Sequence, residues 1–200
     1  MTNEPGQDRA TQLLLASASP RRVELLRQLD LRFEVLPVAV DETWDGSESP
    51  AAHAERLARA KAIAGKKLRP ELVALGADTI VVVDGRVLGK PRDRRHAAVM
   101  LAQLSGRTHQ VHSAVAIAAA TVNSLVSVTV VTFGTLAAAE IDAYLATGEA
   151  DDKAGAYGIQ GRAAAFITRI EGSYSGVMGL PLFETAQLLR QVQEGVPTSR

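Results

Sequence analysis

An apolar segment that runs directly into a helix start is the feature that most constrains the fold. Leu14–Arg22 predicts a short strand that leads at once into a helix. Ser19 can cap that helix, and Pro20 suits its first position, where a missing N–H is tolerated. Strand and helix patterns go on alternating along the chain, which favours the α/β class. The expected strands cover residues 32–36, 72–83, 86–88, 108–118, 127–134 and 165–170, and the expected helices 20–29, 50–67, 94–104, 137–146 and 181–193.

Two arginines stand in the first turn of the first predicted helix. The helix dipole disfavours a cation at this end by about 0.3–1 kcal/mol. A bound polyanion would reverse that penalty, because it would meet free backbone N–H groups, the guanidinium groups of Arg21 and Arg22, and the hydroxyls of Ser17 and Ser19 at one point. The alternative is a solvated charged turn, and these residues alone do not decide between the two.

Composition narrows the classes of function. The chain has 200 residues, of which 46% are hydrophobic and 22% charged, so it fits one large domain or one domain with two lobes. A formal net charge of zero argues against broad binding to nucleic acid or to an anionic membrane. The absence of cysteine excludes disulfides, thiol catalysis and cysteine zinc sites. We expect a cytoplasmic protein with no signal peptide or membrane span, in which residues 12–194 form the domain and residues 1–11 and 195–200 are tails.

Asp78 lies inside an apolar strand pattern, where an unpaired carboxylate is costly. Gly76 suggests a bulge or a close approach of another backbone on the same face. Asp78 is either half of a structural ion pair or a metal ligand or general base. Lys61 continues the apolar stripe of the predicted helix 50–67, so its ammonium group points to the core or into a cleft. Lys90 follows Gly89 just after a predicted hairpin, where an ordinary turn lysine is equally consistent.

A glycine-rich segment at residues 152–161 combines an acid, a base, an aromatic residue and an amide. Its spacing does not match the Walker A or dinucleotide-binding patterns. Tyr157 could stack on a base. Gln160 carries both a donor and an acceptor, which suits the O4 and N3–H edge of uracil or thymine. A plain connecting loop would need neither residue.

The four histidines are predicted to be non-catalytic. His109 and His112 are three residues apart in a predicted strand, so their side chains point to opposite faces and cannot chelate together. His53 and His96 are predicted to lie on the surface. Residues 172–176 lack the central serine of a nucleophile elbow.

Taken together, these segments resemble the Maf family of nucleoside triphosphate pyrophosphatases. The resemblance extends from about Leu13 to Leu189, and several independent motifs occur in the right order. One departure is Gly176, where many members carry asparagine. The matching motifs are Leu15–Arg22, Gly76–Thr79, Gly89–Pro91, Leu104–Gly106, Asp152–Gly161 and Gly179–Leu182.

The resemblance implies a mixed α/β fold like that of the inosine-triphosphate pyrophosphatases (the Maf/Ham1 type). Such a fold has a two-lobed sheet, flanking helices and a central cleft, and its members are usually homodimers. They cleave nucleoside triphosphates between the α- and β-phosphates. The sequence Gly158-Ile159-Gln160-Gly161 is similar to that of the branch acting on dTTP, UTP and modified uridine triphosphates. The alternatives are a 7-methyl-GTP pyrophosphatase of the same family and a nucleotide-binding regulator of cell division.

Roles in binding and catalysis follow from the resemblance by position. Ser17, Arg21 and Arg22 would hold the triphosphate, and Lys61 and Lys90 would neutralise charge as the phosphate bond breaks. These roles meet the usual demand of phosphoryl transfer, which is positioning and charge stabilisation.

The resemblance also implies a divalent cation, Mg²⁺ or Mn²⁺. Asp78 would bind the cation or activate the attacking water. Glu42, with Asp41 and Asp45 beside it, would be the second metal ligand. One or two carboxylates, water and phosphate oxygens can together complete a magnesium shell.

Overall fold

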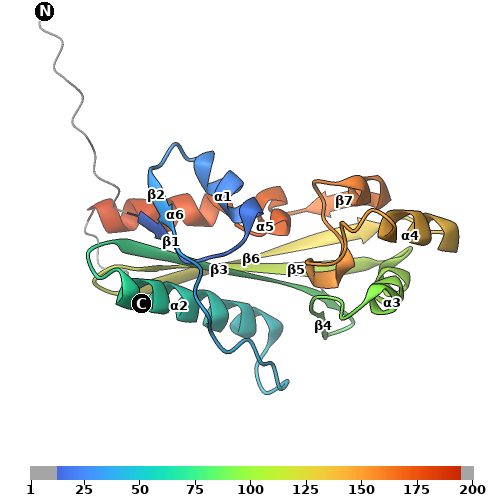
Figure 1. The fold of residues 1–200 in the computed structure, drawn as a ribbon, viewed down its shortest axis with the longest axis horizontal. Coiled ribbons are helices and arrows are strands. Elements are labelled where there is room, and N and C mark those ends of the chain that lie inside the picture. The colour runs from blue at the N-terminus through green and yellow to red at the C-terminus, as the bar shows by residue number, and fades with distance from the viewer. Residues whose placement is uncertain (1–12, 195–200) are drawn as a thin grey trace, which may run out of the picture.

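The computed structural model describes residues 13–194, and both predicted tails lie outside the described residues. Its centre is one mixed seven-stranded sheet in the order β2-β1-β3-β5-β6-β7, with β4 paired to β3 alone (Figure 1). Strand β1 is parallel to both of its neighbours, β2 and β3, and every other pair of strands in the described residues is antiparallel. The strands are β1 (Leu13–Leu15), β2 (Phe33–Val35), β3 (Val73–Val83), β4 (Arg86–Leu88), β5 (Thr108–Ala118), β6 (Val122–Phe133) and β7 (Ile167–Glu171).

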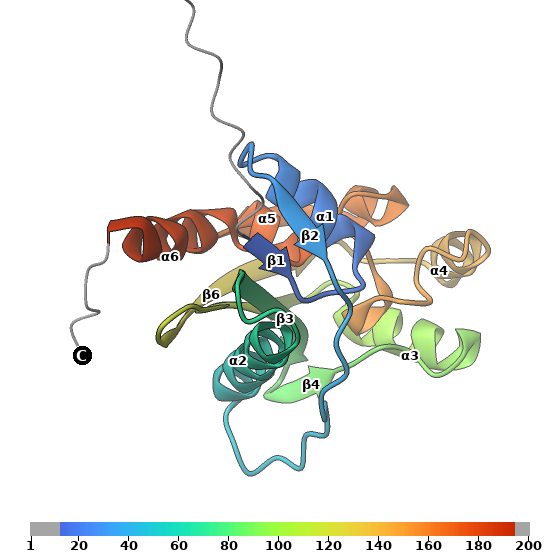
Figure 2. The same cartoon turned by 60° about the vertical axis from the view of Figure 1, so that its left-hand side comes forward.

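Helices cover both faces of this sheet. Helix α2 lies along one face, and α1, α5 and α6 lie on the other, while α3 and α4 pack together at one end (Figures 1 and 2). Within residues 13–194, no helix combines the length and the apolar character that a membrane span requires. The helices are α1 (Pro20–Arg27), α2 (Pro50–Leu68), α3 (Arg94–Leu104), α4 (Ala138–Leu145), α5 (Tyr174–Met178) and α6 (Leu182–Glu194), with 3₁₀ turns at Ala154–Ala156 and Arg162–Phe166.

The serine–proline pairs begin helices as the sequence predicts. Ser19 caps α1 and Ser49 caps α2. Each serine side chain accepts a hydrogen bond from the backbone N–H three residues later, and a proline occupies the first position of both helices. The turn at residues 84–85 joins β3 to β4, and both of its residues have positive φ. These junctions fix where α1 and α2 start relative to the sheet.

Three expectations about the sheet and its connections are wrong. Strand β6 begins at Val122 and not at residue 127, because it pairs with β5 along its whole length. Residues 162–166 form a 3₁₀ turn, so β7 starts at Ile167 and not at residue 165. The short helix α5 has no counterpart among the expected elements.

Helix α2 packs very closely on the middle of β3. An ideal Cβ built on Gly76 would lie 2.3 Å from the carbonyl oxygen of Ala58 and 2.4 Å from the amide nitrogen of Ala62. Strand β3 pairs with β5 in unbroken register on both sides of Gly76, so this residue marks a close backbone approach and not a bulge. The absence of a side chain at Gly76 therefore sets how near α2 comes to β3.

Candidate active site

A cavity of about 610 Å³ lies where the start of α1, helix α2, the middle of β3 and the loop of residues 153–161 meet. Its size is that of an ordinary small-molecule site. Although the whole chain has no net charge, five basic and three acidic side chains line this cavity, which therefore favours an anion. These charged residues are Arg21, Arg22, Lys61, Lys90 and Lys153, against Glu42, Asp78 and Asp152.

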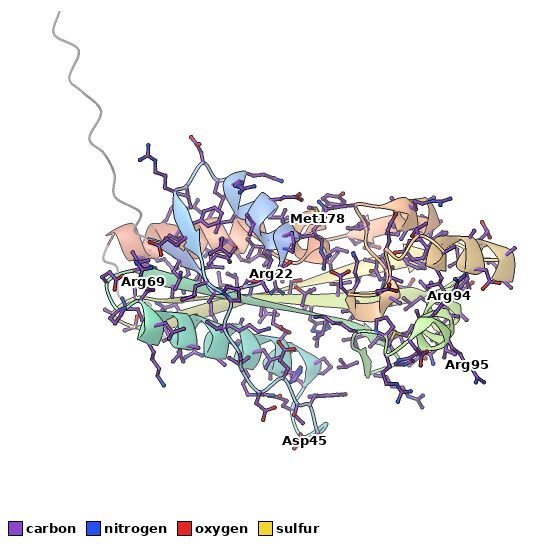
Figure 3. The ribbon with its side chains drawn as sticks, in the orientation of Figure 1. Arg22, Asp45, Arg69, Arg94, Arg95 and Met178 are labelled. Carbon is purple, nitrogen blue, oxygen red and sulfur yellow. The ribbon has the colours of Figure 1, made fainter. Side chains whose placement is uncertain are left out.

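The start of α1 forms one wall. The Ser17 hydroxyl accepts hydrogen bonds from the Ser19 amide at 3.2 Å and from Arg22 Nη1 at 3.3 Å. Arg22 Nε also donates to the carbonyl oxygen of Gly179 at 2.9 Å. Figure 3 shows Arg22 beside the middle of the sheet. Arg22 is thus oriented by neutral oxygens, and burial lowers its pKa while the charge of Asp78 opposes that shift.

Arg21 points to a different partner. Its Nη1 lies 3.2 Å from Oδ2 of Asp152, a mostly exposed carboxylate at the start of the glycine-rich loop. This ion pair connects α1 to the loop across the cavity. Exposed pairs of this kind contribute about 0–1 kcal/mol, so an anionic ligand can displace Asp152 at little cost.

Lys61 joins two carboxylates from separate parts of the chain. Its Nζ lies 2.7 Å from Oδ1 of Asp78 and 2.7 Å from Oε1 of Glu42. Asp78 and Lys61 are buried, whereas the side chain of Glu42 is 59% exposed. The hydrogen bond from Lys61 is the main cause that lowers the pKa of the Glu42 carboxyl. Asp78 therefore forms the ion pair that its sequence position posed as one alternative, and it also lines the cavity, while its part as a metal ligand or general base stays a prediction.

The arrangement fits a hard cation shared with a ligand. Glu42 and Asp78 offer carboxylate oxygens within reach of one ammonium nitrogen, and such oxygens are the ligands that Mg²⁺ prefers. Among residues 13–194, no group of three or more histidine, aspartate or glutamate side chains could hold a metal ion by itself. The donor set thus suits a cation completed by water and phosphate oxygens, which is common for Mg²⁺ in nucleotide sites.

The loop of residues 153–161 forms the opposite wall. Gly155 and Ala156 both have positive φ, a conformation that is uncommon for alanine and is held here by surrounding contacts. The Gly155 amide donates to the Gly89 carbonyl at 3.1 Å, which ties this loop to the segment that carries Lys90. Lys90 and Gln160 are both exposed at the cavity wall.

Tyr157 is packed into the core under this loop. Only 5% of the residue is exposed, its ring lies edge-on to Phe133 and His109, and its hydroxyl lies 2.8 Å from His109 Nε2. Burial raises the pKa of Tyr157. Tyr157 does line the cavity, but little of its ring is free for the base stacking expected from the sequence, and its packing supports the loop that carries Gln160.

One of the histidine expectations holds and one is wrong. His109 and His112 point to different partners, and burial lowers the pKa of His109 to about 4. His53 is only 3% exposed and lines the cavity, contrary to its predicted surface position. It is buried because its Nδ1 pairs with Glu48 Oε1 at 2.8 Å and its ring lies near Trp44.

The sequence analysis missed the residues that orient Arg22. The Gly179 carbonyl accepts from Arg22 and also from the Thr79 hydroxyl, at 3.3 Å. Gly179 has a φ of 124°, which favours glycine, and it lies directly before the residues that lead into α6. That glycine was recognised only as part of a motif, because nothing local shows that its carbonyl faces an arginine 157 positions away.

The chain is similar to known proteins over most of its length. A family model described as Maf-like protein matches residues 12–192. A dTTP/UTP pyrophosphatase of Salmonella typhimurium is 56% identical over 90% of this chain and 92% of its own length. Proteins of the same name from Yersinia pestis (55%, covering 90% and 92%) and Vibrio cholerae (52%, covering 90% and 98%) are also similar. Among solved structures, a nucleoside-triphosphatase (dITP/XTP pyrophosphatase) of Mycobacterium abscessus matches with a TM-score of 0.45 and 20% identity, over 93% of this chain and 99% of that one. The chain belongs to the Maf-like protein family.

Proposed function

We propose that this protein hydrolyses dTTP and UTP, and modified uridine triphosphates, between the α- and β-phosphates to a nucleoside monophosphate and pyrophosphate. The observation that carries the proposal is the buried Lys61, which holds Asp78 and Glu42 at 2.7 Å inside a cavity with an excess of basic side chains. The names of the similar proteins supply the substrate class. The carboxylate buried beside an ammonium group at this place favours an enzyme over a site that only binds nucleotide.

The basic residues would bind and orient the triphosphate. Arg22 is already fixed by Ser17 and Gly179, so little side-chain freedom is lost when it meets a phosphate oxygen. Free N–H groups at the start of α1 add further donors to the same region. Arg21 would exchange Asp152 for phosphate, and Lys90 would neutralise charge from the opposite rim.

Asp78 would carry out the proton transfer of hydrolysis. The attacking water forms a new P–O bond while the bond between phosphorus and the bridging oxygen breaks, and the Asp78 carboxylate accepts the proton that the water loses. Lys61 keeps that carboxylate in place from the α2 side. Arg22 and Lys61 would stabilise the negative charge that develops on the departing pyrophosphate.

A divalent cation, Mg²⁺ or Mn²⁺, is part of the proposal. Glu42 and Asp78 would hold it together with phosphate oxygens, and it would supply charge neutralisation at the phosphates. Because Lys61 contacts both carboxylates, this lysine would have to share them with the cation. Because the proposed reaction needs the cation, we expect excess chelator to abolish turnover and added Mg²⁺ to restore it.

Gln160 would distinguish the base. It is exposed on the cavity wall, at the end of a loop held from behind by Tyr157. Its amide offers one donor and one acceptor, which match O4 and N3–H of uracil or thymine. The 4-amino group of cytosine would present a donor where the amide donor lies.

The direct test is to incubate the protein with Mg²⁺ and, separately, dTTP, UTP, CTP, GTP and 7-methyl-GTP, and to resolve the products. We expect monophosphate and pyrophosphate from dTTP and UTP. The same products from 7-methyl-GTP alone would overturn the role of Gln160 and favour the other branch of the family. Diphosphate with inorganic phosphate, or no turnover, would contradict the proposed reaction. An Asp78→Asn preparation controls for contaminating phosphatases.

The family resemblance further leads us to propose a homodimer that acts in the cytoplasm, with neither nucleic acid nor membrane as a partner. The balanced charge of the chain supports the absence of nucleic-acid and membrane partners. Light scattering during size-exclusion chromatography would test the homodimer, since a monomer would contradict it.

A further inference from the structure

The segment between β2 and α2 carries Glu42 and has no regular secondary structure. We call residues 41–48 the acidic loop. It lies on the α2 side of the sheet and turns back to the start of α2 (Figures 1 and 2), and Asp45 marks its far end (Figure 3). Glu42 itself is mostly exposed and reaches the cavity through a single ion pair with Lys61. Something other than local backbone structure must therefore hold Glu42 in position.

Arg56 of α2 holds the acidic loop at two points. Its Nε and Nη2 donate to the Glu48 carboxylate over 2.8–3.2 Å, and its Nη2 also donates to the Thr43 carbonyl oxygen at 3.0 Å. His53 adds a contact of 2.8 Å to the same carboxylate, and Trp44 Nε1 donates to the Glu48 carbonyl at 3.4 Å. The hydrogen bonds from Arg56 are the main cause that lowers the pKa of Glu48, which keeps its carboxylate charged at neutral pH.

The contacts between Arg56 and the loop lie outside the cavity. Arg56 and Glu48 are absent from the residues that line the cavity, whereas Glu42, Trp44 and His53 belong to them. Thr43, whose carbonyl Arg56 binds, is the neighbour of Glu42 in the chain. Arg56 and Lys61 both belong to α2, so one helix fixes the backbone beside Glu42 and also binds the Glu42 carboxylate.

We propose that Arg56 and Glu48 are positioning residues, which hold the acidic loop on α2 and so place the Glu42 carboxylate beside Lys61. The inference rests on the proposed function only where it gives Glu42 a part in turnover. Groups that orient a metal-binding or catalytic side chain from behind typically change affinity or activity by about 10–100-fold when they are lost. A planar fork that binds a carboxylate and a carbonyl together cannot be replaced by a lysine ammonium group.

The chain contains one tryptophan, and it lies in the acidic loop. Quenching of Trp44 fluorescence by acrylamide therefore reports attachment of the loop without any need for activity. We expect Arg56→Gln and Glu48→Gln to increase quenching at least twofold, with circular dichroism unchanged. Arg56→Lys should not restore the original value. Arg59→Gln is the matched control, because Arg59 lies on the same helix but bonds to Val122 and Ser124 of β6.

Turnover of dTTP gives the second measurement. Arg56→Gln should lower kcat about 10–100-fold and raise the Mg²⁺ concentration needed for half-maximal rate. In a double-mutant cycle with Glu42→Gln, the Arg56 change should have little further effect, since both act through one carboxylate. Arg59→Gln should stay within threefold of the starting protein.

The outcomes separate the two proposals. Unchanged Trp44 quenching in Arg56→Gln would overturn the inference whatever the activity. Increased quenching with unchanged kcat and Mg²⁺ dependence would show that the attachment does not place Glu42, and would overturn the inference while the proposed function stands. Fully additive effects of Arg56→Gln and Glu42→Gln on kcat would also overturn the inference and leave the proposed function standing. If the starting protein hydrolyses no triphosphate, the proposed function fails, and with it the part assigned to Glu42.

Discussion

Replacement of Gly76 by alanine tests whether the close packing of α2 on β3 sets the geometry of the site. The new methyl group would lie 2.3 Å from the Ala58 oxygen, 2.4 Å from the Ala62 nitrogen and 3.0 Å from the Lys61 carbonyl carbon. All three are backbone atoms of α2, so no side chain can rotate away. Ordinary contacts between such atoms lie near 3.5 Å, so α2 would have to move about 1 Å away from β3.

Gly76→Ala is expected to lower the free energy of unfolding only modestly but to lower turnover strongly. Overfilling a packed interior destabilises by about 1–3 kcal/mol, and replacement of a strand glycine by alanine regains about 0.5–1 kcal/mol. We expect a net loss of about 1–2 kcal/mol, which a domain of ordinary stability of about 5–15 kcal/mol survives. Lys61 would move with α2, however, and a misplacement of about 1 Å can lower turnover about 100-fold.

Urea unfolding and dTTP turnover on the same preparations would measure both effects. Gly89→Ala is the control for stability, because a Cβ there meets no atom within 4 Å, and it should change the free energy of unfolding by less than about 0.5 kcal/mol. If Gly76→Ala keeps its stability within about 0.5 kcal/mol and its kcat close to that of the starting protein, the reasoning from close packing is refuted.

Three further predictions concern single side chains. Asp78→Asn should lower kcat about 10²–10⁴-fold, the usual contribution of a general base, while nucleotide affinity measured by calorimetry is largely kept. Gln160→Ala should raise KM for dTTP and UTP about tenfold, the equivalent of about 1.4 kcal/mol, since two hydrogen bonds to the base are lost. His109 has a folded-state pKa of about 4, below its ordinary value of 6.5, so its contribution to stability is present above pH 6.5 and is lost as the pH falls towards 4. Between pH 7.5 and 5 the loss should be about 2 kcal/mol, and His109→Gln should remove it from the pH dependence of urea unfolding.

Each of these has an outcome that contradicts it. Undiminished turnover in Asp78→Asn would show that another group accepts the proton. Equal KM increases for GTP and dTTP in Gln160→Ala would remove its role in base selection. For the pH dependence, His96→Gln is the control, because His96 is partly exposed on α3. An identical loss of stability on acidification in His109→Gln and the starting protein would assign the loss to other groups.

The sequence predicted the parts of the fold that depend on local chemistry. The Ser19-Pro20 and Ser49-Pro50 pairs located two helix starts, since capping and proline geometry act within one turn. The start of β6 at Val122 was missed because Asn123 and Ser124 resemble a turn, and only pairing with β5 keeps them extended. Residues 162–166 and α5 are short and take their conformation from packing.

In the site too, local chemistry could be predicted from the sequence, whereas contacts between distant segments could not. Asp78 was conspicuous because a carboxylate in an apolar strand needs a partner, and Lys61 was found by its place on the apolar stripe of α2. Which residue was the partner could not be foreseen, because that depends on how α2 lies on β3. The contact between Glu48 and Arg56, the burial of His53 and the packed ring of Tyr157 were missed for a related reason. Each depends on the path of a loop that no local pattern determines.

Strand β3 passes without interruption under the whole site. Its 11 residues extend about 36 Å at about 3.3 Å per residue, and Asp78 is the sixth of them. Strands β5 and β6 run alongside it over a similar length (Figure 1). No break in the strands therefore divides the sheet at the cavity, so we expect the sheet to resist a hinge rotation of the kind seen between separate domains. We expect substrate entry and product release to depend instead on local movement of the acidic loop and of residues 153–161, so the slow conformational step should respond to substitutions in these loops and not to changes at the ends of the sheet.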